Sequence, residues 1–381
     1  MDNRLYRLKN HIKHYEWGSA KLIPEFLSIE NDDEVPYAEM WMGTHRLSPS
    51  QAEVDGRLAD LTEISADLPF LFKLIAVESP LSIQAHPDKE RAEEGFKREE
   101  SQGLSIRNPT RNYKDANHKP EILCALSTFT LMAGFREPDG ICISLEEFLL
   151  VAPQLKEIIS PLLRALGSGS LSGFFRILSN FSRIEREYLS IFIREKEGSQ
   201  DGIISPVQWK LMKDFAAQYP GDPAIISPLY LNIVTLQPGQ AVFVPAGVLH
   251  AYLSGFGVEL MAASDNVLRG GLTPKHVDTG ELMNVLHFVP FIPQIITPAS
   301  SATRFCYHTP CSDFLLTLMR GAGDENVFAE TKPAICLVTE GELRAGSETF
   351  KKGESFFVPQ SDCSHLFGGN YSLFSASPGT T

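Results

Sequence analysis

The stretch that decides the fold is PGQAVFVPAGVLHAY, which occupies residues 238–252. Its apolar and β-branched residues are interrupted by prolines and glycines, a pattern typical of a strand, a tight turn and a second strand. His250 begins the second strand, and we expect its side chain to point into a β-barrel. A weaker copy, KGESFFVPQSDCSHLF, occupies residues 352–367 and contains His365. Two related β domains in tandem would explain this repeat.

Short apolar runs bounded by turns continue on both sides of this stretch and predict further strands. Between about residues 140 and 222 the hydrophobic period changes from two to near 3.6, which indicates helices. We therefore expect a mainly β protein in which an α-helical domain interrupts the first of two jelly-roll domains. The predicted segments are 1–139 and 223–297 for the first β domain, 140–222 for the helical insert, and 298–381 for a degenerate second β domain.

Three serines in the insert carry signals of a helix N-terminus. Ser144 precedes a glutamate by three residues, as in a capping box. Ser160 and Ser205 each precede a proline, which favours the first position of a helix. In the last of these helices, apolar residues at four-residue steps predict a buried stripe, formed by Val207, Leu211, Phe215 and Tyr219.

Composition limits the kinds of partner that the protein can have. The 381 residues include 34 lysines and arginines against 47 aspartates and glutamates, and the net charge of −13 argues against nucleic acid or an anionic membrane surface. No apolar run approaches the ~20 residues of a membrane-spanning helix, and no secretory signal begins the chain. Six scattered cysteines without a CxxC pair fit buried thiols in a reducing compartment. We therefore expect a cytoplasmic protein, and a monomer.

The spacing of Gly239, Pro245, Gly247 and His250 resembles the second motif of the cupin superfamily. The glycines and the proline shape a tight turn between two strands, and the histidine follows this turn. The resemblance implies that His250 is a metal ligand at the mouth of the barrel.

Further candidate ligands occur in two other segments. Gln84 and His86 lie two residues apart, as do Lys119 and Glu121, so each pair shares one face of a strand. Gln84, His86, Glu121 and His250 together offer two nitrogen and two oxygen donors. This set suits zinc with room for a water or substrate, and it also leaves iron or manganese open.

Longer runs of the sequence are similar to the type I mannose-6-phosphate isomerase family. The similarity covers roughly residues 1–280 apart from the insert, with two departures, Glu16 in place of a frequent aspartate and Gly270 in place of a usual alanine. The runs that carry it are YEWGS (15–19), AEMWMGTH (38–45), PLSIQAHPD (80–88), YKDANHKPE (113–121) and HAYLSGFGVELMAASDNVLRGGLTPK (250–275).

This resemblance implies a zinc-dependent aldose-ketose isomerase that interconverts mannose 6-phosphate and fructose 6-phosphate through an enediol, with one Zn2+ per chain. The four zinc ligands of the family fall on Gln84, His86, Glu121 and His250. Its essential arginine falls on Arg269, and its active-site lysine and tyrosine fall on Lys119 and Tyr252.

The chemistry of the reaction suggests a role for each of these residues, but it leaves open which residue is the base. A cation such as Arg269 would stabilise the negative charge of the enediolate. Lys119 is one candidate for the base that removes the carbon-bound proton, because a nearby metal would lower its pKa. Glu259 on the following strand is the other candidate. We expect the phosphate to bind three further residues, Lys275, Ser82 and Lys73.

Two functions of other classes remain open at this level. A carbohydrate-binding cupin would keep the metal without turnover, but it would not need Lys119, Glu259 and Arg269 together. A non-haem iron oxygenase would not be expected to carry a glutamine ligand or cations suited to phosphate. Metal analysis together with an isomerase assay would separate the three functions.

Overall fold

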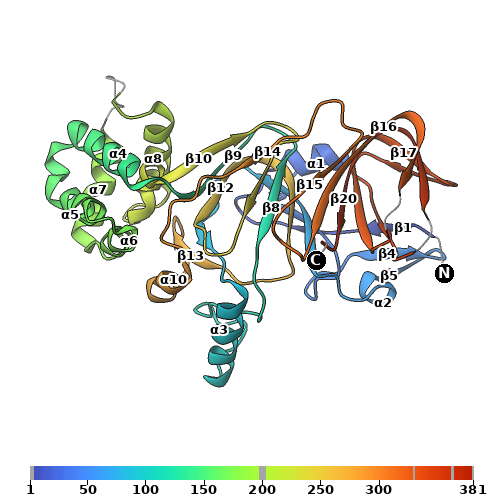
Figure 1. The fold of residues 1–381 in the computed structure, drawn as a ribbon, viewed down its shortest axis with the longest axis horizontal. Coiled ribbons are helices and arrows are strands. Elements are labelled where there is room, and N and C mark those ends of the chain that lie inside the picture. Colours follow the sequence, from blue (N-terminus) through green and yellow to red (C-terminus); the bar gives the residue numbers. More distant parts are fainter. Residues whose placement is uncertain (1–3, 197–202, 329–330, 362–363, 380–381) are drawn as a thin grey trace.

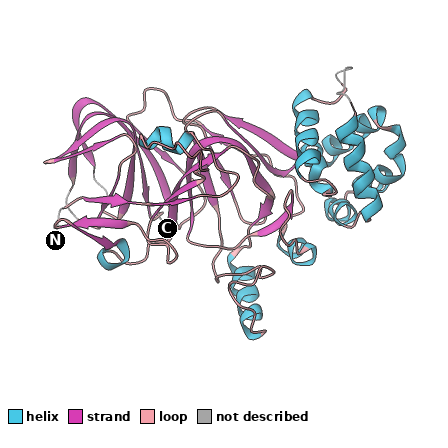
Figure 2. Ribbon diagram, turned by 180° about the vertical axis from the view of Figure 1, so that it is seen from behind, coloured by secondary structure: helices cyan, strands magenta, loops and turns pink. Residues whose placement is uncertain are grey.

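The computed structural model describes residues 4–196, 203–328, 331–361 and 364–379. Its strands form two large sheets in the body of the molecule, and a cluster of helices lies at one end, far from the C-terminal strands (Figure 1). The view from behind shows the same separation of helices and strands (Figure 2). A mainly β fold with an inserted helical domain is therefore confirmed.

The first sheet has eleven strands and contains most of the predicted site residues. Its long strand β12 pairs with β7 and β9 through its first half and with β6 and β8 through its second half. Gly255 lies at this change of partners with a φ of 131°, and a Cβ there would lie 2.7 Å from Phe129 Cα, so a side chain does not fit. The strands are β2 (His11–Lys13), β3 (Glu39–Met42), β6 (Phe70–Val77), β7 (Ile83–Ala85), β8 (Glu121–Ala125), β9 (Phe129–Phe135), β10 (Leu231–Leu236), β11 (Ala241–Val244), β12 (His250–Ala262), β13 (Leu268–Gly271) and β14 (Ile295–Ile296).

Within the described residues, the second sheet has nine strands and combines N-terminal with C-terminal segments of the chain. The N-terminal strand β1 pairs with β19, so β1, β4 and β5 extend the sheet of the C-terminal strands. β20 follows β19 in the chain as β12 follows β11, and His365 begins β20 as His250 begins β12. The two members of each pair are not neighbours in their sheets, because β17 lies between β19 and β20 and β8 lies between β11 and β12. The strands are β1 (Tyr6–Lys9), β4 (Gln51–Val54), β5 (Arg57–Asp60), β15 (Arg304–Tyr307), β16 (Leu315–Phe328), β17 (Ala334–Ala345), β18 (Glu348–Lys351), β19 (Ser355–Val358) and β20 (His365–Ser377).

The two sheets share an apolar core that determines which face of the first sheet carries the site. Ile122 of β8 and Val258 of β12 are buried in this core together with Tyr307 of β15. Because alternate residues of a strand face opposite sides, the neighbouring Glu121 and Glu259 project from the other face. The second sheet thus covers the back of the first sheet and leaves the carboxylates on the inner side.

The helical insert lies between β9 and β10, which pair with each other so that Phe135 is opposite Leu231. Its helices pack around Phe148, Phe174 and Trp209, and this apolar core continues into residues of β7, β9 and β12 in the first sheet. The insert contains α4 (Pro138–Val151), η1 (Pro153–Leu155), α5 (Lys156–Gly167), α6 (Leu171–Ser179), α7 (Arg183–Glu195) and α8 (Pro206–Gln218), and η2 (Pro223–Ile226) and α9 (Ser227–Tyr230) lead back to β10. The other helices are α1 (Leu22–Leu27), α2 (Leu61–Ile64), α3 (Lys89–Ser101) and α10 (Thr279–Val285).

The predicted helix starts in the insert have different outcomes. Ser205 is the N-cap of α8 with Pro206 at its first position, as predicted. The capping box at Ser144 is wrong, because α4 already begins at Pro138 and the Ser144 hydroxyl accepts a hydrogen bond from Arg136 instead. The start at Ser160 is also wrong, since Pro161 lies inside α5.

The predicted buried stripe of α8 is only partly correct. Phe215 is buried, but Val207 is 54% exposed, and the fully buried face is completed by Trp209 and Met212. Residues four apart advance 40° around a helix at each step, because 3.6 residues make one turn. A stripe drawn at strict four-residue steps therefore leaves the buried face within two turns.

Candidate active site

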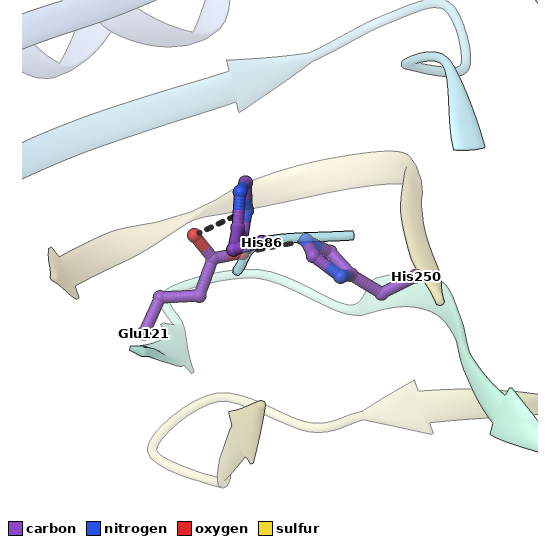
Figure 3. A group of neighbouring side chains, drawn as sticks. All are labelled: His86, Glu121 and His250. Atoms are coloured by element: carbon purple, nitrogen blue, oxygen red, sulfur yellow. Dashed lines mark ion pairs between the residues drawn. The ribbon is translucent and has the colours of Figure 1, made fainter. Parts of the chain in front are cut away.

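Three buried side chains converge on the inner side of the first sheet, as Figure 3 shows. Glu121 lies between two imidazoles, with its Oε1 2.8 Å from His250 Nε2 and its Oε2 3.5 Å from His86 Nε2. Each of the three side chains is at most 1% exposed. One donor atom from each residue lies within 4.8 Å of the others, a spacing at which the three atoms can bind one metal ion.

The strands bring these residues together from distant parts of the sequence. His250 is the first residue of β12 and pairs with Gln84 of β7, which His86 follows two residues later. Glu121 is the first residue of β8, and β8 pairs with the far half of β12. The register of β12 with β7 and β8 therefore sets the distances within the cluster.

Backbone carbonyls orient the two imidazoles. His86 Nδ1 lies 2.7 Å from the carbonyl oxygen of Asn266, and His250 Nδ1 lies 3.0 Å from that of Val248. Because a carbonyl oxygen only accepts hydrogen bonds, each Nδ1 carries a proton, and each Nε2 is the ring nitrogen directed into the cluster. Both Nε2 atoms face Glu121, and this is the arrangement that metal-binding histidines adopt.

Electrostatics keep this cluster in the protonation state that a cation needs. Burial, followed by the positive charge of Lys119, lowers the pKa of His86 to about 3, so its imidazole is neutral. Burial acts to raise the pKa of Glu121, but Lys119 and the two histidines outweigh it and hold that pKa well below its usual value. The Oε2 atom of Glu121 is buried without a hydrogen-bond partner, so the carboxylate retains an unused acceptor.

The remaining predicted ligand, Gln84, lies against the same cluster. Its Nε2 is 3.3 Å from His250 Nε2, and a half-turn of the amide would place its oxygen there instead. The structure thus brings together all four side chains that the sequence predicted as metal ligands.

Two further side chains contact the carboxylate of Glu121. Lys119 Nζ lies 3.3 Å from Glu121 Oε2 and 3.3 Å from His86 Nε2. The Tyr252 hydroxyl donates a hydrogen bond of 3.1 Å to Glu121 Oε1, and burial raises the pKa of Tyr252 well above its usual value. Tyr252 therefore remains protonated and holds Glu121 in place.

Glu259 belongs to a buried charge cluster beside this group. Its Oε2 accepts a hydrogen bond of 2.8 Å from Lys73 Nζ, which also lies 3.3 Å from Glu39 Oε1. Burial acts to lower the pKa of Lys73, but the two carboxylates outweigh it and raise this pKa. Lys73 is therefore charged and already paired with two carboxylates of the protein.

The other predicted cations, Arg269 and Lys275, lie near each other, and neither forms an ion pair with a described residue. Arg269 on β13 is half-buried, which lowers its pKa, and among the described residues its guanidinium forms no ion pair. Lys275 is exposed, and its pKa is lowered by partial burial and then by the positive charges of Arg269 and Lys114, against the effect of Glu16. This concentration of positive charge suits a phosphate group. Ser82 precedes β7 and is half-buried.

Two residues of this region were not predicted from the sequence. Lys114 lies in the run YKDANHKPE, so that run offered a signal for it. Asn266 is completely buried, and its side chain accepts a hydrogen bond of 2.7 Å from the backbone N–H of Lys114 and donates one of 2.8 Å to the carbonyl of Asp115. Since its own carbonyl binds His86, Asn266 connects the segment that leads to Glu121 with a metal-ligand candidate.

A buried cluster of two imidazoles and one carboxylate within antiparallel strands defines a candidate metal site of the cupin type. Among the residues that the structure describes, it is the only group of three or more His, Cys, Asp or Glu side chains with this spacing. His365, the first residue of β20, lies outside it.

Comparison with known proteins identifies the family. The family model described as "Phosphomannose isomerase type I, catalytic domain" matches residues 5–138. The mannose-6-phosphate isomerase of Salmonella typhimurium is 36% identical over 377 residues, which cover 93% of this chain and 94% of that protein. The human mannose-6-phosphate isomerase is 31% identical over 398 residues, which cover 91% of this chain and 90% of that protein. The chain belongs to the type I phosphomannose isomerase family.

A solved structure of a relative extends this likeness to the whole fold. A zinc-bound crystal structure of mannose 6-phosphate isomerase superposes with a TM-score of 0.87 at 32% identity, and it covers 99% of this chain and 100% of that chain. The match includes the helical insert and the C-terminal sheet. The family model covers only residues 5–138, so these later regions are assigned by the full-length relatives and by the fold.

Proposed function

We propose that the protein is a zinc-dependent isomerase that interconverts mannose 6-phosphate and fructose 6-phosphate through an enediol. The observation that carries this proposal is the buried cluster of His86, Glu121 and His250 in a chain that belongs to the isomerase family. A relative with the same fold binds zinc. The protein would therefore bind one Zn2+ through these three residues and Gln84.

The donor set of this site fits zinc on its own chemistry. Two imidazoles, one carboxylate and one amide match the nitrogen and oxygen ligands that zinc takes, and Glu121 Oε2 is buried without a hydrogen bond. When bound, zinc supplies a Lewis acid that stabilises negative charge on the sugar oxygens. Lys119 and Tyr252, which both contact Glu121, keep this carboxylate aimed at the site.

We assign the proton transfers and the charge stabilisation to three residues. Lys119 lies directly against the ligand cluster, whereas the Glu259 carboxylate is bound by Lys73, and this favours Lys119 as the base that takes the carbon-bound proton. Arg269, whose charge is free of carboxylate partners among the described residues, stabilises the enediolate. Tyr252 contributes a proton donor beside Glu121.

The phosphate group requires cations that the protein does not already use. Lys275 meets this condition, and Lys114 and Arg269 add to the positive potential around it. Ser82 and Lys73 remain proposed contacts, but Lys73 would first have to leave Glu259 and Glu39. We therefore propose Lys275 as the main phosphate ligand.

The setting of the enzyme follows from two observations. No helix in the described part of the chain is long and apolar enough to cross a membrane. The five cysteines that the structure describes are free thiols, as in a reducing compartment. We propose a monomer that acts in the cytoplasm.

The test is incubation of the purified protein with mannose 6-phosphate and detection of fructose 6-phosphate, with and without a chelator. We expect activity that the chelator removes and that added zinc restores. Metal bound in stoichiometric amount without turnover would instead support a carbohydrate-binding protein. Turnover that survives complete removal of the metal would contradict the proposed site.

A further inference from the structure

The chain makes a strained turn directly after Arg269. Gly271 has a φ of 135° and Leu272 a φ of 52°, in the region that L-residues rarely occupy. The pairing of β13 with β7 is irregular at the same point, where Arg269 is opposite Gln84 and Gly271 is opposite Ile83. Such a backbone persists only where other contacts hold it.

The carboxylate of Asp222 supplies these contacts. Its Oδ2 accepts a hydrogen bond of 2.7 Å from the backbone N–H of Leu272, and the N–H of Thr273 also donates to this carboxylate. Its Oδ1 accepts a hydrogen bond of 2.8 Å from the N–H of Ala224 at the start of η2. One side chain therefore binds both the strained turn and the segment that leaves the helical insert.

Asp222 itself is fixed by the insert. The N–H of Asp222 donates to the carbonyl of Tyr219, which ends α8, and the N–H of Gly221 donates to the hydroxyl of Ser190 on α7. The turn 219–222 thus connects two helices of the insert to the turn after β13.

The packing between η2 and β13 leaves no free space at this junction. A Cβ built on Gly271 would lie 2.3 Å from Ala224 Cβ and 3.0 Å from Asp222 Oδ1. One residue earlier, the nearest atoms to a Cβ on Gly270 would all be the ends of side chains, at 3.1 Å from Leu249 Cδ2, 3.3 Å from Leu282 Cδ2 and 3.5 Å from Ile83 Cγ2. The two neighbouring glycines therefore differ sharply in what a methyl group would displace.

We propose that Asp222 is a positioning residue through which the helical insert fixes the placement of Arg269 and Lys275. Arg269 precedes the turn that Asp222 binds, and Lys275 follows it two residues after Thr273. A shift of this turn would move both cations relative to Gln84 and the rest of the site. The proposal rests on the proposed function, because that function assigns Arg269 and Lys275 to the sugar phosphate.

The decisive variant is Asp222→Ser. A serine hydroxyl retains a cap for the N–H of Ala224, but it is too short to bind Leu272 at the same time. We expect kcat/KM for mannose 6-phosphate to fall at least ten-fold, because displacements of about 1 Å at reacting groups cost up to roughly a hundred-fold. Zinc content and the helical signal of the insert should stay unchanged.

Two matched variants control for loss of stability and for steric effects. Ser182→Ala removes the capping box of α7, which lies in the insert but not at the junction, and should lower the melting temperature while kcat/KM is retained. Gly271→Ala should lower kcat/KM as Asp222→Ser does, whereas Gly270→Ala should leave it within about two-fold. The glycine pair tests the same junction even if Asp222→Ser does not fold.

Hydrogen exchange gives a readout that does not require turnover. In Asp222→Ser, the amides of Leu272 and Thr273 should exchange faster, while those of α7 should not change. An inactive parent enzyme would contradict the proposed function, and the exchange experiment would still test the coupling. A kcat/KM equal to that of the parent in both Asp222→Ser and Gly271→Ala would overturn the positioning role, as would unchanged exchange at Leu272.

Discussion

Replacing Lys73 with methionine should destabilise the protein strongly, although Lys73 was predicted from sequence to bind phosphate. Its side chain is only 7% exposed, and its partners Glu259 and Glu39 are 4% and 9% exposed. Lys73→Met would keep the length of the side chain but leave two buried carboxylates without their common cation. Breaking a buried pair in this way costs about 3–5 kcal/mol, so we expect a loss of this size in the free energy of unfolding.

The measurement is denaturant unfolding of the zinc-loaded protein, with Lys210→Met as the control. Lys210 forms an ion pair with Asp214 on the surface of α8, where the lysine side chain is 76% exposed, and its loss should cost less than about 1 kcal/mol. Adding Glu259→Gln to Lys73→Met should recover part of the loss, because it removes one unpaired charge. A loss below about 1 kcal/mol for Lys73→Met, together with a raised KM, would refute this reasoning and restore Lys73 as a phosphate ligand.

The other predictions concern the metal, the transition state and the phosphate. His86→Ala should lose most of its bound zinc in elemental analysis, whereas His365→Ala should keep about one zinc per chain. Undiminished zinc in His86→Ala would contradict the proposed metal site. Arg269→Ala should lower kcat by about 10²–10³ with little change in KM, and an effect confined to KM would make Arg269 a phosphate anchor. Lys275→Ala should raise KM for mannose 6-phosphate with zinc content unchanged, and free mannose should be a very poor substrate of the parent enzyme. An unaltered KM in Lys275→Ala would indicate that Lys114 and Ser82, rather than Lys275, bind the phosphate group.

The proposed metal ligands could be picked out from the sequence because each one belongs to a short local pattern. Gln84 and His86 share a strand face by their spacing, and His250 follows a turn whose glycines and proline are visible in the sequence. Glu121 required only the same two-residue rule. The register that places His250 opposite Gln84 could not be predicted, because strand pairing depends on the whole sheet.

Residues that act through tertiary contacts were not predictable in the same way. Asn266 binds His86 through its backbone carbonyl, a group that every residue carries, so no side-chain pattern marks it. Asp222 resembles any turn aspartate in sequence, and its second hydrogen bond reaches a residue 50 positions away. The capping prediction at Ser144 failed for a related reason, because an earlier proline was able to begin the helix first.

Lys73 shows why the assignment of the catalytic base depended on the structure. All eight residues of β6 are buried, so this strand lacks the alternation that would reveal which face Lys73 occupies. The register places Lys73 opposite Glu259 on β12 and opposite Trp41 on β3, and neither pairing can be read from spacing in the sequence. Once this pairing is known, Glu259 is a partner of a buried cation, whereas Lys119 contacts the metal-ligand cluster directly. Solvent deuterium incorporation at carbon 2 of the sugar phosphate should therefore be lost in Lys119→Met and retained in Glu259→Gln. Loss of this exchange in Glu259→Gln would instead show that the Glu259 carboxylate removes the proton.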